Sequence, residues 1–375
     1  MRRQHNSRPT SLAKGKNAPL LTVLHAQMYI LTGLLALRVQ MHRTAYFDLL
    51  NVLACISVIT LHCNSYTHSF AHNTAWMQSV FFETFFYPAV PIFFMLSGAT
   101  LLNYRTRYTT KIFLQKRFKK TLLPYIFFTT FFFLLSYIKA SLSEPSTFDI
   151  HGLFSSLFTG HVRYAHYWFF IPLFIFYLFA PFLEKIASHS QTTELIELSI
   201  IVFFFQMVVP LINLFGNFEI TQSTAIYGFS IFALWGFALH NSNLEKNKIL
   251  LILLGILALF SYIIRYWAIV NSSEHTQILF NYFGFYSIIP TTFLFLLAKS
   301  ANSYLANHPF FCNKLVQLSS CSFGIYLLHG FIIACLPFDD ASLFRRTVCV
   351  PIVYICSMTC TIILKRIKFL SWMAP

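Results

Sequence analysis

Charged residues are scarce in this 375-residue sequence. Asp, Glu, Lys and Arg together make up 10% of the chain, against roughly 25% in an average soluble domain. Hydrophobic residues make up 57%, and the mean hydropathy is +0.62. With 12 glycines the chain cannot be collagen-like, and its apolar content excludes a disordered chain. These features predict a polytopic membrane protein instead of a soluble one.

Acidic residues are scarcer than basic ones, and closely spaced cysteine pairs are missing. The chain has 12 Asp and Glu against 27 Lys and Arg, a formal net charge of +15. Nucleic-acid binding would need a basic face on a soluble domain, so we expect no nucleic-acid partner. The eight cysteines form no Cys-x-x-Cys pair, which excludes the usual zinc and redox spacings. We interpret them as small core residues and expect no metal site.

Long apolar runs dominate the rest of the sequence. A bilayer core needs about 20 apolar residues per helix, so this length allows roughly ten helices with short loops. The sequence therefore predicts an all-α transmembrane bundle of about ten spans. The predicted spans lie near residues 46–66, 79–103, 121–141, 165–183, 195–215, 225–240, 249–270, 282–299, 321–338 and 346–364.

The loops between these runs alternate in charge. Seven cations lie within residues 104–120, and loops on the same predicted side bring the total to fifteen. Loops on the opposite side carry four: Lys139, Arg163, Arg345 and Arg346. Cytoplasmic loops are enriched in Lys and Arg. We therefore predict a multi-pass protein of the bacterial cytoplasmic membrane, with both ends of the ten-span bundle in the cytoplasm.

The first 44 residues fit this pattern less well. A basic polar head precedes an apolar stretch at residues 19–37 that is interrupted by two polar side chains. This stretch is an eleventh span, a signal peptide, a membrane-surface helix or an extension upstream of a natural start near Met41. We favour the surface helix or the extension. Residues 1–44 are thus a predicted N-terminal extension, and residues 45–375 a single membrane domain.

Polar residues form a stripe on the first predicted span. Asp48, Asn51, Cys55 and His62 lie within about 60° of one another at 100° per residue. Ionisable groups inside a membrane span face a cavity or a partner by default. Asp48 and Asn51 either line such a cavity or only bond neighbouring helices. Histidine titrates near neutrality, so His62 is a candidate general base.

The second predicted span carries Glu83 and ends in Ser97-Gly98. Spans one and two are antiparallel neighbours, so Glu83 is predicted at the depth of His62, where a carboxylate would orient the imidazole. The alternative is that Glu83 reaches the outer interface. Ser97-Gly98 permits local unwinding beside a cavity or, alternatively, close helix packing.

The basic segment that follows has more cations than orientation requires. Arg105, Arg107, Arg117 and Lys120 are therefore candidates to bind a cytoplasmic polyanion, such as a phosphorylated cofactor. Anionic lipid headgroups are the alternative partner.

Five further residues are candidates to line a substrate cavity. His166 and Trp168 open the fourth predicted span, Arg265 lies near the outer end of the seventh, and Tyr326 and His329 share one face of the ninth. Each has an alternative: Trp168 as an interface anchor, Arg265 bound to outer phosphates and His329 as a core histidine.

Five motifs, taken in order, resemble the type-3 membrane acyltransferase family. They are residues 46–54 leading to His62, 90–98, 116–125, 166–169 and 322–329, and the resemblance covers residues 45–365. It implies a membrane helix bundle that moves an acyl group, commonly acetyl from acetyl-CoA, onto a hydroxyl of a surface polysaccharide or other envelope glycan. The implied partners are acyl-CoA, a surface glycan or lipid-linked sugar acceptor, and membrane lipids.

The resemblance also assigns roles to individual residues. His62 matches the family's essential histidine, and Arg117 with Lys120 resembles its cytoplasmic Arg-x-x-Arg pair. Two family arginines are replaced, one on the first span by Asn51 and one on the second by Tyr87. Both replacements remove permanent cations, so the donor's phosphates would rest on Arg105, Arg107, Arg117 or other residues.

We therefore expect an O-acetyltransferase that uses acetyl-CoA as donor substrate and holds no permanently bound cofactor. The alternative is a non-enzymatic exporter or flippase of a glycan or lipid-linked precursor. In that case the polar stripe would line a permeation path and the basic segment would bind headgroups. Hydrolysis of acyl-CoA by the purified protein separates the two hypotheses.

Overall fold

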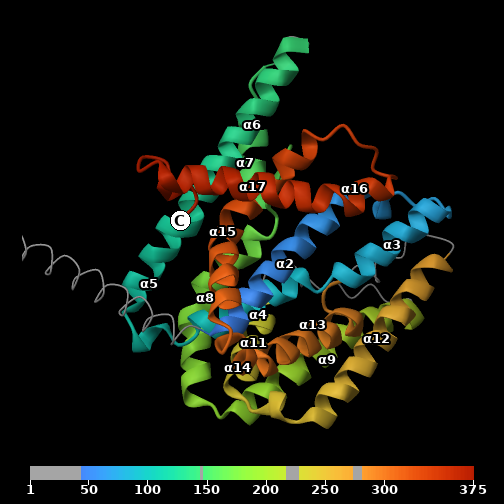
Figure 1. Cartoon of the computed structure of the whole chain (residues 1–375), viewed down its shortest axis with the longest axis vertical. Coiled ribbons are helices and arrows are strands. Elements are labelled where there is room, and N and C mark those ends of the chain that lie inside the picture. The colour runs from blue at the N-terminus through green and yellow to red at the C-terminus, as the bar shows by residue number, and fades with distance from the viewer. Residues whose placement is uncertain (1–43, 144–146, 217–227, 273–280) are drawn as a thin grey trace, which may run out of the picture. The chain divides into compact units, whose positions relative to one another are not determined.

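The computed structural model describes residues 44–143, 147–216, 228–272 and 281–375. Residues Ala45–Pro375 form one compact unit (Figure 1). This unit is almost entirely helical, which confirms the predicted all-α class. The predictions for residues 1–43, including the apolar stretch at 19–37, lie outside the described residues.

The secondary structure consists of α-helices joined by short turns. The α-helices are α2 (Ala45–Cys63), α3 (Thr74–Phe86), α4 (Ala89–Leu101), α5 (Thr110–Arg117), α6 (Leu123–Ser143), α7 (Ile150–Thr159), α8 (Phe170–His189), α9 (Thr192–Gly216), α11 (Phe229–Asn241), α12 (Lys248–Val270), α13 (Phe285–Ser300), α14 (Asn302–Ala306), α15 (Pro309–Ala334), α16 (Leu343–Thr347) and α17 (Cys349–Arg366). The shorter elements are η1 (Ser65–His68), η2 (Tyr104–Thr106), η3 (Phe118–Leu122), η4 (Leu244–Lys246), η6 (Ser371–Met373), β1 (His161–Val162) and β2 (Ala165–His166).

Each predicted span corresponds to a helix or a pair of joined helices. In the described part of the chain, seven segments are long and apolar enough to cross a membrane. They are 45–63, 74–106, 110–142, 170–189, 248–270, 309–334 and 349–366. Helix α13 is a shorter apolar helix. Two predicted spans are composite, because the second breaks at Pro88 between α3 and α4 and the third contains η3 between α5 and α6.

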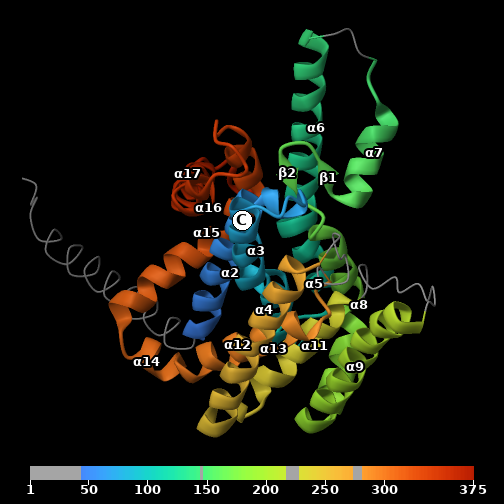
Figure 2. The same cartoon turned by 90° about the vertical axis from the view of Figure 1, so that its right-hand side faces the viewer.

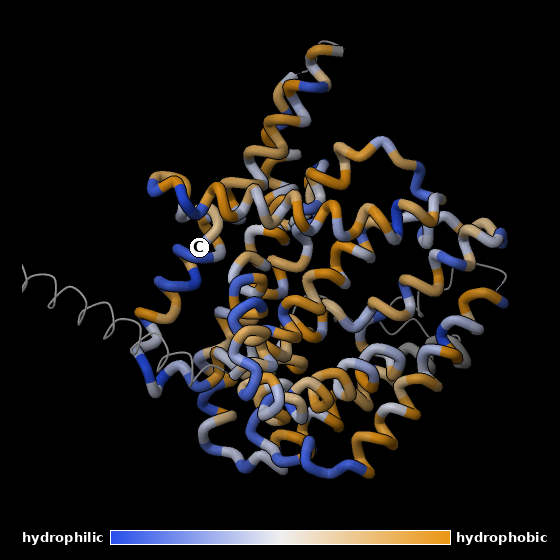
Figure 3. The backbone as a smooth tube through the Cα atoms, in the orientation of Figure 1, coloured by the Kyte–Doolittle hydropathy of each residue, from blue (hydrophilic) through white to orange (hydrophobic). Residues whose placement is uncertain are grey.

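The outer face of α12 shows why the chain needs a lipid environment. Its large apolar side chains include Ile249, Ile252, Ile256 and Phe260, each more than half exposed. Figure 3 shows apolar residues along α12 and polar residues in the connection before it. Leaving apolar side chains in water costs about 25 cal/mol per Å² of exposed surface, whereas hydrocarbon removes that cost.

The centre of the unit is built around α2, α4, α11 and α15 (Figures 1 and 2). Helices α4 and α11 pack backbone against backbone at Gly98. A Cβ atom there would lie 1.7 Å from the carbonyl oxygen of Ala233, so only glycine allows this approach. Ser97 remains helical, and its hydroxyl donates to the carbonyl of Phe93. Close helix packing, and not unwinding, therefore explains Ser97-Gly98.

The start of the fourth predicted span needs a correction. Helix α8 begins at Phe170 instead of residue 165, because His166 belongs to the two-residue strand β2. Strand β2 pairs antiparallel with β1, His161 opposite His166. This hairpin follows α7, which runs beside α6 (Figure 2). The sequence pattern of Tyr167, Trp168 and Phe169 resembled the start of a helix, yet these residues form the turn that precedes it.

Candidate functional site

A cavity lies beside the end of α2, and we call it the histidine chamber. Its volume is about 240 Å³. Its walls come from α2, η1, α3, α4, the turn before α8, the segment before α13, and α15. The lining residues are Val58, Leu61, His62, His68, Glu83, Tyr87, Val90, Phe93, Trp168, Phe169, Tyr282 and Tyr326.

A second cavity lies nearer the start of α2, and we call it the serine chamber. Its volume is about 300 Å³. Its lining combines hydroxyl and amide groups from α2, α4 and α15 with several phenyl rings. The lining residues are Asn51, Phe93, Ser97, Phe169, Phe170, Leu173, Ser319, Ser320, Ser322, Phe323, Tyr326 and Pro375.

Helix α2 connects the two chambers, as its polar stripe suggested. Asn51 lines the serine chamber and His62 the histidine chamber. Eleven residues separate them, which is roughly 16 Å along a helix at 1.5 Å per residue. The Asn51 amide donates to the Ser319 hydroxyl at 2.8 Å, so it also joins α2 to α15. Asp48 is buried in the first turn of α2 and lines neither chamber.

Three histidine rings meet beside the histidine chamber. The ring of His62 stacks on that of His166, with centroids 3.9 Å apart and planes 7° apart. The His329 ring lies 5.2 Å from His62 and 6.2 Å from His166, measured between centroids. We call these residues the histidine cluster. It combines α2, β2 and α15, elements that are far apart in the sequence.

The hairpin brings His166 to this cluster. Helix α7 ends at Gly160, whose φ of 72° is a left-handed conformation that favours glycine. The chain then turns back, and the Tyr326 hydroxyl donates to the carbonyl of His166 at 2.8 Å. The Tyr167 hydroxyl donates to the carbonyl of Leu327. These two bonds fix the hairpin on α15 and hold the His166 ring against His62.

Hydrogen bonding fixes the tautomer of His329. Its Nδ1 lies 2.6 Å from the carbonyl oxygen of Tyr326, so Nδ1 carries the proton and donates it. Its Nε2 is buried and has no hydrogen-bond partner among the described residues, which leaves a free lone pair in the cluster. The pKa of His166 is lowered to about 4, first by partial removal from water and then by His161. His166 is therefore neutral at pH 7.

Glu83 lies in the same chamber as His62, as predicted, but its polar neighbours are different ones. The groups that act electrostatically on Glu83 are Arg265 and Asn64, whereas those that act on His62 are other histidines. The hydrogen bonds of the described residues include none between Glu83 and His62. The expected orientation of His62 by a carboxylate is therefore replaced by ring stacking.

Arg265 is fully buried and does not reach an outer surface. Its guanidinium carbon lies 3.8 Å from the ring centroid of Tyr87 and 5.1 Å from that of Tyr286. It donates to the carbonyl oxygen of Glu83 at 3.3 Å. The Tyr87 ring, which replaces a family arginine, stacks on Tyr282 at 4.3 Å. Arg265 thus supports the wall of the histidine chamber from behind.

Two of the candidate phosphate ligands have protein partners. Nε of Arg105 forms an ion pair with the buried carboxylate of Glu184 on α8, at 2.6 Å. Arg107 donates to the Thr100 carbonyl at 2.7 Å and to the Asn103 side chain. Arg105 therefore joins the basic segment to α8, and Arg107 closes the end of α4.

The other two candidates lie at a π-helix, Arg117 directly before it and Lys120 within it. In η3 the amide of Leu123 donates to the carbonyl of Phe118, five residues earlier. Arg117 precedes η3, and its guanidinium lies 5.8 Å from the ring centroid of Phe113 and 5.7 Å from that of Tyr177. Lys120, within η3, is exposed.

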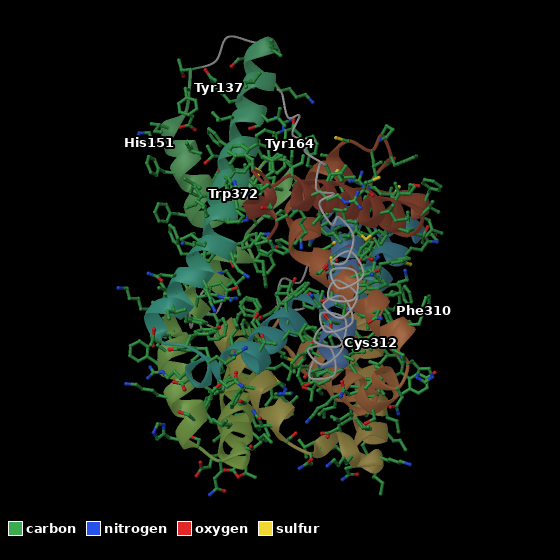
Figure 4. The ribbon with its side chains drawn as sticks, turned by 60° about the vertical axis from the view of Figure 1, so that its left-hand side comes forward. Tyr137, His151, Tyr164, Phe310, Cys312 and Trp372 are labelled. Atoms are coloured by element: carbon green, nitrogen blue, oxygen red, sulfur yellow. The ribbon has the colours of Figure 1, made fainter. Side chains whose placement is uncertain are left out.

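The segment after α17 returns to the serine chamber. Trp372 packs edge-on against Phe127 of α6, at 5.5 Å between centroids. Figure 4 marks the position of Trp372. Met373 and Ala374 are buried, and Pro375 lines the serine chamber. The element η6 also contacts η3. The basic π-helix and the serine chamber therefore lie on either side of the same short segment.

Several residues of this site were not predicted. Ser319 lies on the α15 face that carries Tyr326 and His329, so a longer periodicity search would have found it, whereas Ser320 lies on a different face of the helix. Phe93 and Phe169 are two of 45 phenylalanines in a largely apolar sequence, so nothing in the sequence marked them as cavity residues. Glu184 lies one residue beyond the predicted span at 165–183, so the rarity of acidic residues inside spans did not point to its buried ion pair.

The described residues contain no group of three His, Cys, Asp or Glu side chains placed to hold a metal ion. The eight cysteines are free thiols. Cys55, Cys63, Cys321 and Cys349 are buried, as expected of core residues, but the expectation is wrong for Cys335, Cys356 and Cys360, which are exposed.

The site can be compared with known protein families. The acyltransferase domain family matches residues 44–366, which is most of the chain. No curated protein and no solved structure matches the chain. The matched region contains all five motifs and the lining residues of both chambers except Pro375. The chain therefore belongs to the type-3 acyltransferase family and is a membrane acyltransferase.

Proposed function

We propose that this acyltransferase takes acetyl from cytoplasmic acetyl-CoA and transfers it to a hydroxyl of a cell-surface polysaccharide or other envelope glycan. The supporting observation is the arrangement of two chambers along α2. One is lined with hydroxyls and lies near a basic segment, and the other lies beside the histidine cluster, with His62 in its wall. A donor and an acceptor that approach from opposite sides of a membrane need such a pair of cavities.

The donor half of the proposal rests on the basic segment and the serine chamber. Exposed cations such as Lys119 and Lys120 would bind the CoA phosphates, because charge-assisted hydrogen bonds to phosphate are among the strongest in proteins. The serine chamber would accept the pantetheine arm, whose amides match hydroxyl and amide partners such as Ser97 and Asn51. We place this segment in the cytoplasm because of its cations.

The chemical step is proposed for the histidine chamber. His62 would take the proton of the acceptor hydroxyl while that oxygen attacks the thioester carbonyl carbon. The tetrahedral intermediate then collapses, the C–S bond breaks, and the CoA thiolate leaves with its electron pair. Protonated His62 returns its proton to the thiolate, which gives free CoA and an ester and regenerates neutral histidine.

His166 and His329 support this role. Two imidazolium rings at 3.9 Å would repel strongly, so a neutral His166 is the neighbour that allows His62 to take up a proton during the reaction. The free Nε2 of His329 offers a second acceptor close by.

The test uses membranes from cells with and without the gene, supplied with acetyl-labelled acetyl-CoA. We expect label in alkali-labile esters of the envelope glycan only when the wild-type protein is present, and loss of label with His62→Ala. If glycan export changes while no label is incorporated and purified protein releases no CoA, the exporter or flippase hypothesis replaces this proposal.

A further inference from the structure

Three aromatic rings separate the two chambers. Phe93 of α4, Phe169 before α8 and Tyr326 of α15 are the residues that both described linings have in common. The centroid of Phe169 lies 5.9 Å from that of Phe93 and 5.5 Å from that of Tyr326. At these distances the rings are in contact and form a partition.

We propose that these rings form a constriction that sets the size of the acyl group delivered from the serine chamber to His62. The inference rests on the proposed function, because it assumes that a thioester enters the serine chamber. It adds the residues that determine acyl specificity, with Phe93 as the ring that moves.

Tyr326 and Phe169 are held in place. The Tyr326 hydroxyl donates to the His166 carbonyl at 2.8 Å, and the Tyr326 ring is buried. Phe169 is also buried, and its ring packs edge-on against Phe94 at 5.0 Å. Moving either ring would cost a hydrogen bond or a packed aromatic contact.

Phe93 is the least constrained of the three rings. Its side chain is only partly buried and borders both chambers, so it has open space on two sides. Its backbone is fixed, because its carbonyl accepts the Ser97 hydroxyl at 2.8 Å inside α4. A rotamer change at Phe93 would therefore open the partition without moving a helix.

Phe93 is also the cleanest position for a test. Tyr326 contacts the catalytic region twice, through its hydroxyl to His166 and through its carbonyl to Nδ1 of His329. A substitution of Tyr326 would disturb the histidine cluster as well as the partition. Phe93 forms neither of these bonds, so its truncation changes the width of the opening alone.

The experiment measures release of free CoA thiol by purified protein in lipid vesicles, with acetyl-, butyryl- and hexanoyl-CoA as probes and water as acceptor. We expect Phe93→Ala to raise the hexanoyl-to-acetyl rate ratio about tenfold or more, because one methylene is worth roughly 10–200-fold in a fitted pocket. Phe93→Leu should give a smaller rise.

Each of two matched control variants widens one chamber and leaves the partition unchanged. Leu173 lines the serine chamber and Val90 the histidine chamber, and neither borders both. Leu173→Ala and Val90→Ala should leave the rate ratio within about twofold, since a factor of two is only about 0.4 kcal/mol. An unchanged ratio in both Phe93 variants, or an equal rise in the controls, would overturn the constriction.

A second measurement does not depend on activity. Val90→Cys places a thiol in the histidine chamber, and bulky thiol reagents are added to each face of sealed vesicles, with site-resolved mass spectrometry as readout. We expect a reagent from the serine-chamber face to modify this thiol only when Phe93→Ala is also present. Equal modification with and without Phe93→Ala overturns the inference. Absence of CoA release by wild type, in contrast, refutes the proposed function.

Discussion

The imidazole rings of His62 and His166 lie face to face, with centroids 3.9 Å apart and planes 7° apart. Two positive charges at that separation would repel each other strongly in a partly desolvated site. At least one ring is therefore uncharged in the folded protein, and His166, with its pKa lowered to about 4, fits that state. The stack thus keeps a proton acceptor available beside the histidine chamber.

His62→Ala should lower acyl transfer by about 10²–10⁴-fold, because removal of a general base commonly costs that much. Amounts of inserted protein should not change, because the His62 side chain forms ring contacts at the end of α2 and alanine keeps the helix intact. The measurement is transfer of labelled acetyl per amount of inserted protein. His308→Ala, at an exposed position after α14, is the control and should be near wild type. Substantial transfer by His62→Ala removes His62 from the mechanism.

The double variant Arg117→Ala, Lys120→Ala should bind acyl-CoA about tenfold more weakly or worse. Hydrogen bonds to charged groups contribute about 1.5–3 kcal/mol, and 1.4 kcal/mol is a factor of ten. Calorimetry in detergent measures the affinity.

Lys246→Ala with Lys314→Ala removes two other cations of the same predicted side, one in η4 and one in α15, and should leave the affinity within about twofold, or roughly 0.4 kcal/mol. If the Arg117 and Lys120 variant also keeps its affinity, the basic segment binds lipid headgroups instead.

Arg105→Ala should destabilise the fold more than it weakens CoA binding. It leaves the Glu184 carboxylate buried without its 2.6 Å partner. Because the Arg105 side chain is partly exposed, we expect a loss of about 1–2 kcal/mol in the free energy of unfolding, below the full cost for a buried pair. Thermal denaturation measures the loss, and Arg105→Ala combined with Glu184→Gln should recover part of it. A large loss of CoA affinity with unchanged stability would mean that Arg105 binds the donor.

Asn51→Arg should lower acyl transfer although it restores the family's arginine. Asn51 bonds Ser319, and the serine chamber is lined by neutral side chains. An unpaired cation inside a membrane span costs about 2.5–3.5 kcal/mol on insertion scales. Transfer and CoA affinity are measured together, with Asn51→Gln as the control that keeps an amide. Higher transfer with tighter CoA binding would show that the chamber accepts a phosphate at this position.

The sequence predicted the parts of the fold that depend on local patterns. Apolar runs of membrane length predicted the helices, and the spacing of Asn51 and His62 on one helical face predicted that both would line cavities. The sequence also predicted that Tyr326 and His329 share one helical face. In the structure the His329 ring contacts the His62 ring, and the Tyr326 ring contacts the His329 ring.

Contacts between distant segments could not be predicted in this way. The stack of His166 on His62 depends on a turn at Gly160 and on tyrosine hydroxyls that reach across 160 residues of sequence. The pairing of Arg105 with Glu184 likewise joins two different helices. Periodicity describes one helix at a time, so it identifies the face of a residue but not the partner opposite that face.

The π-helix η3 has a consequence for comparing this chain with its relatives. A π-helical turn contains one residue more than an α-helical turn, so it is the structural trace of a single-residue insertion within a helix. A relative without that insertion would have its basic residues rotated by about 100° against the helix that follows. An alignment with such a relative across residues 110–143 should therefore place a one-residue gap inside 118–122, because without the gap Arg117 would be matched with a residue on a different face.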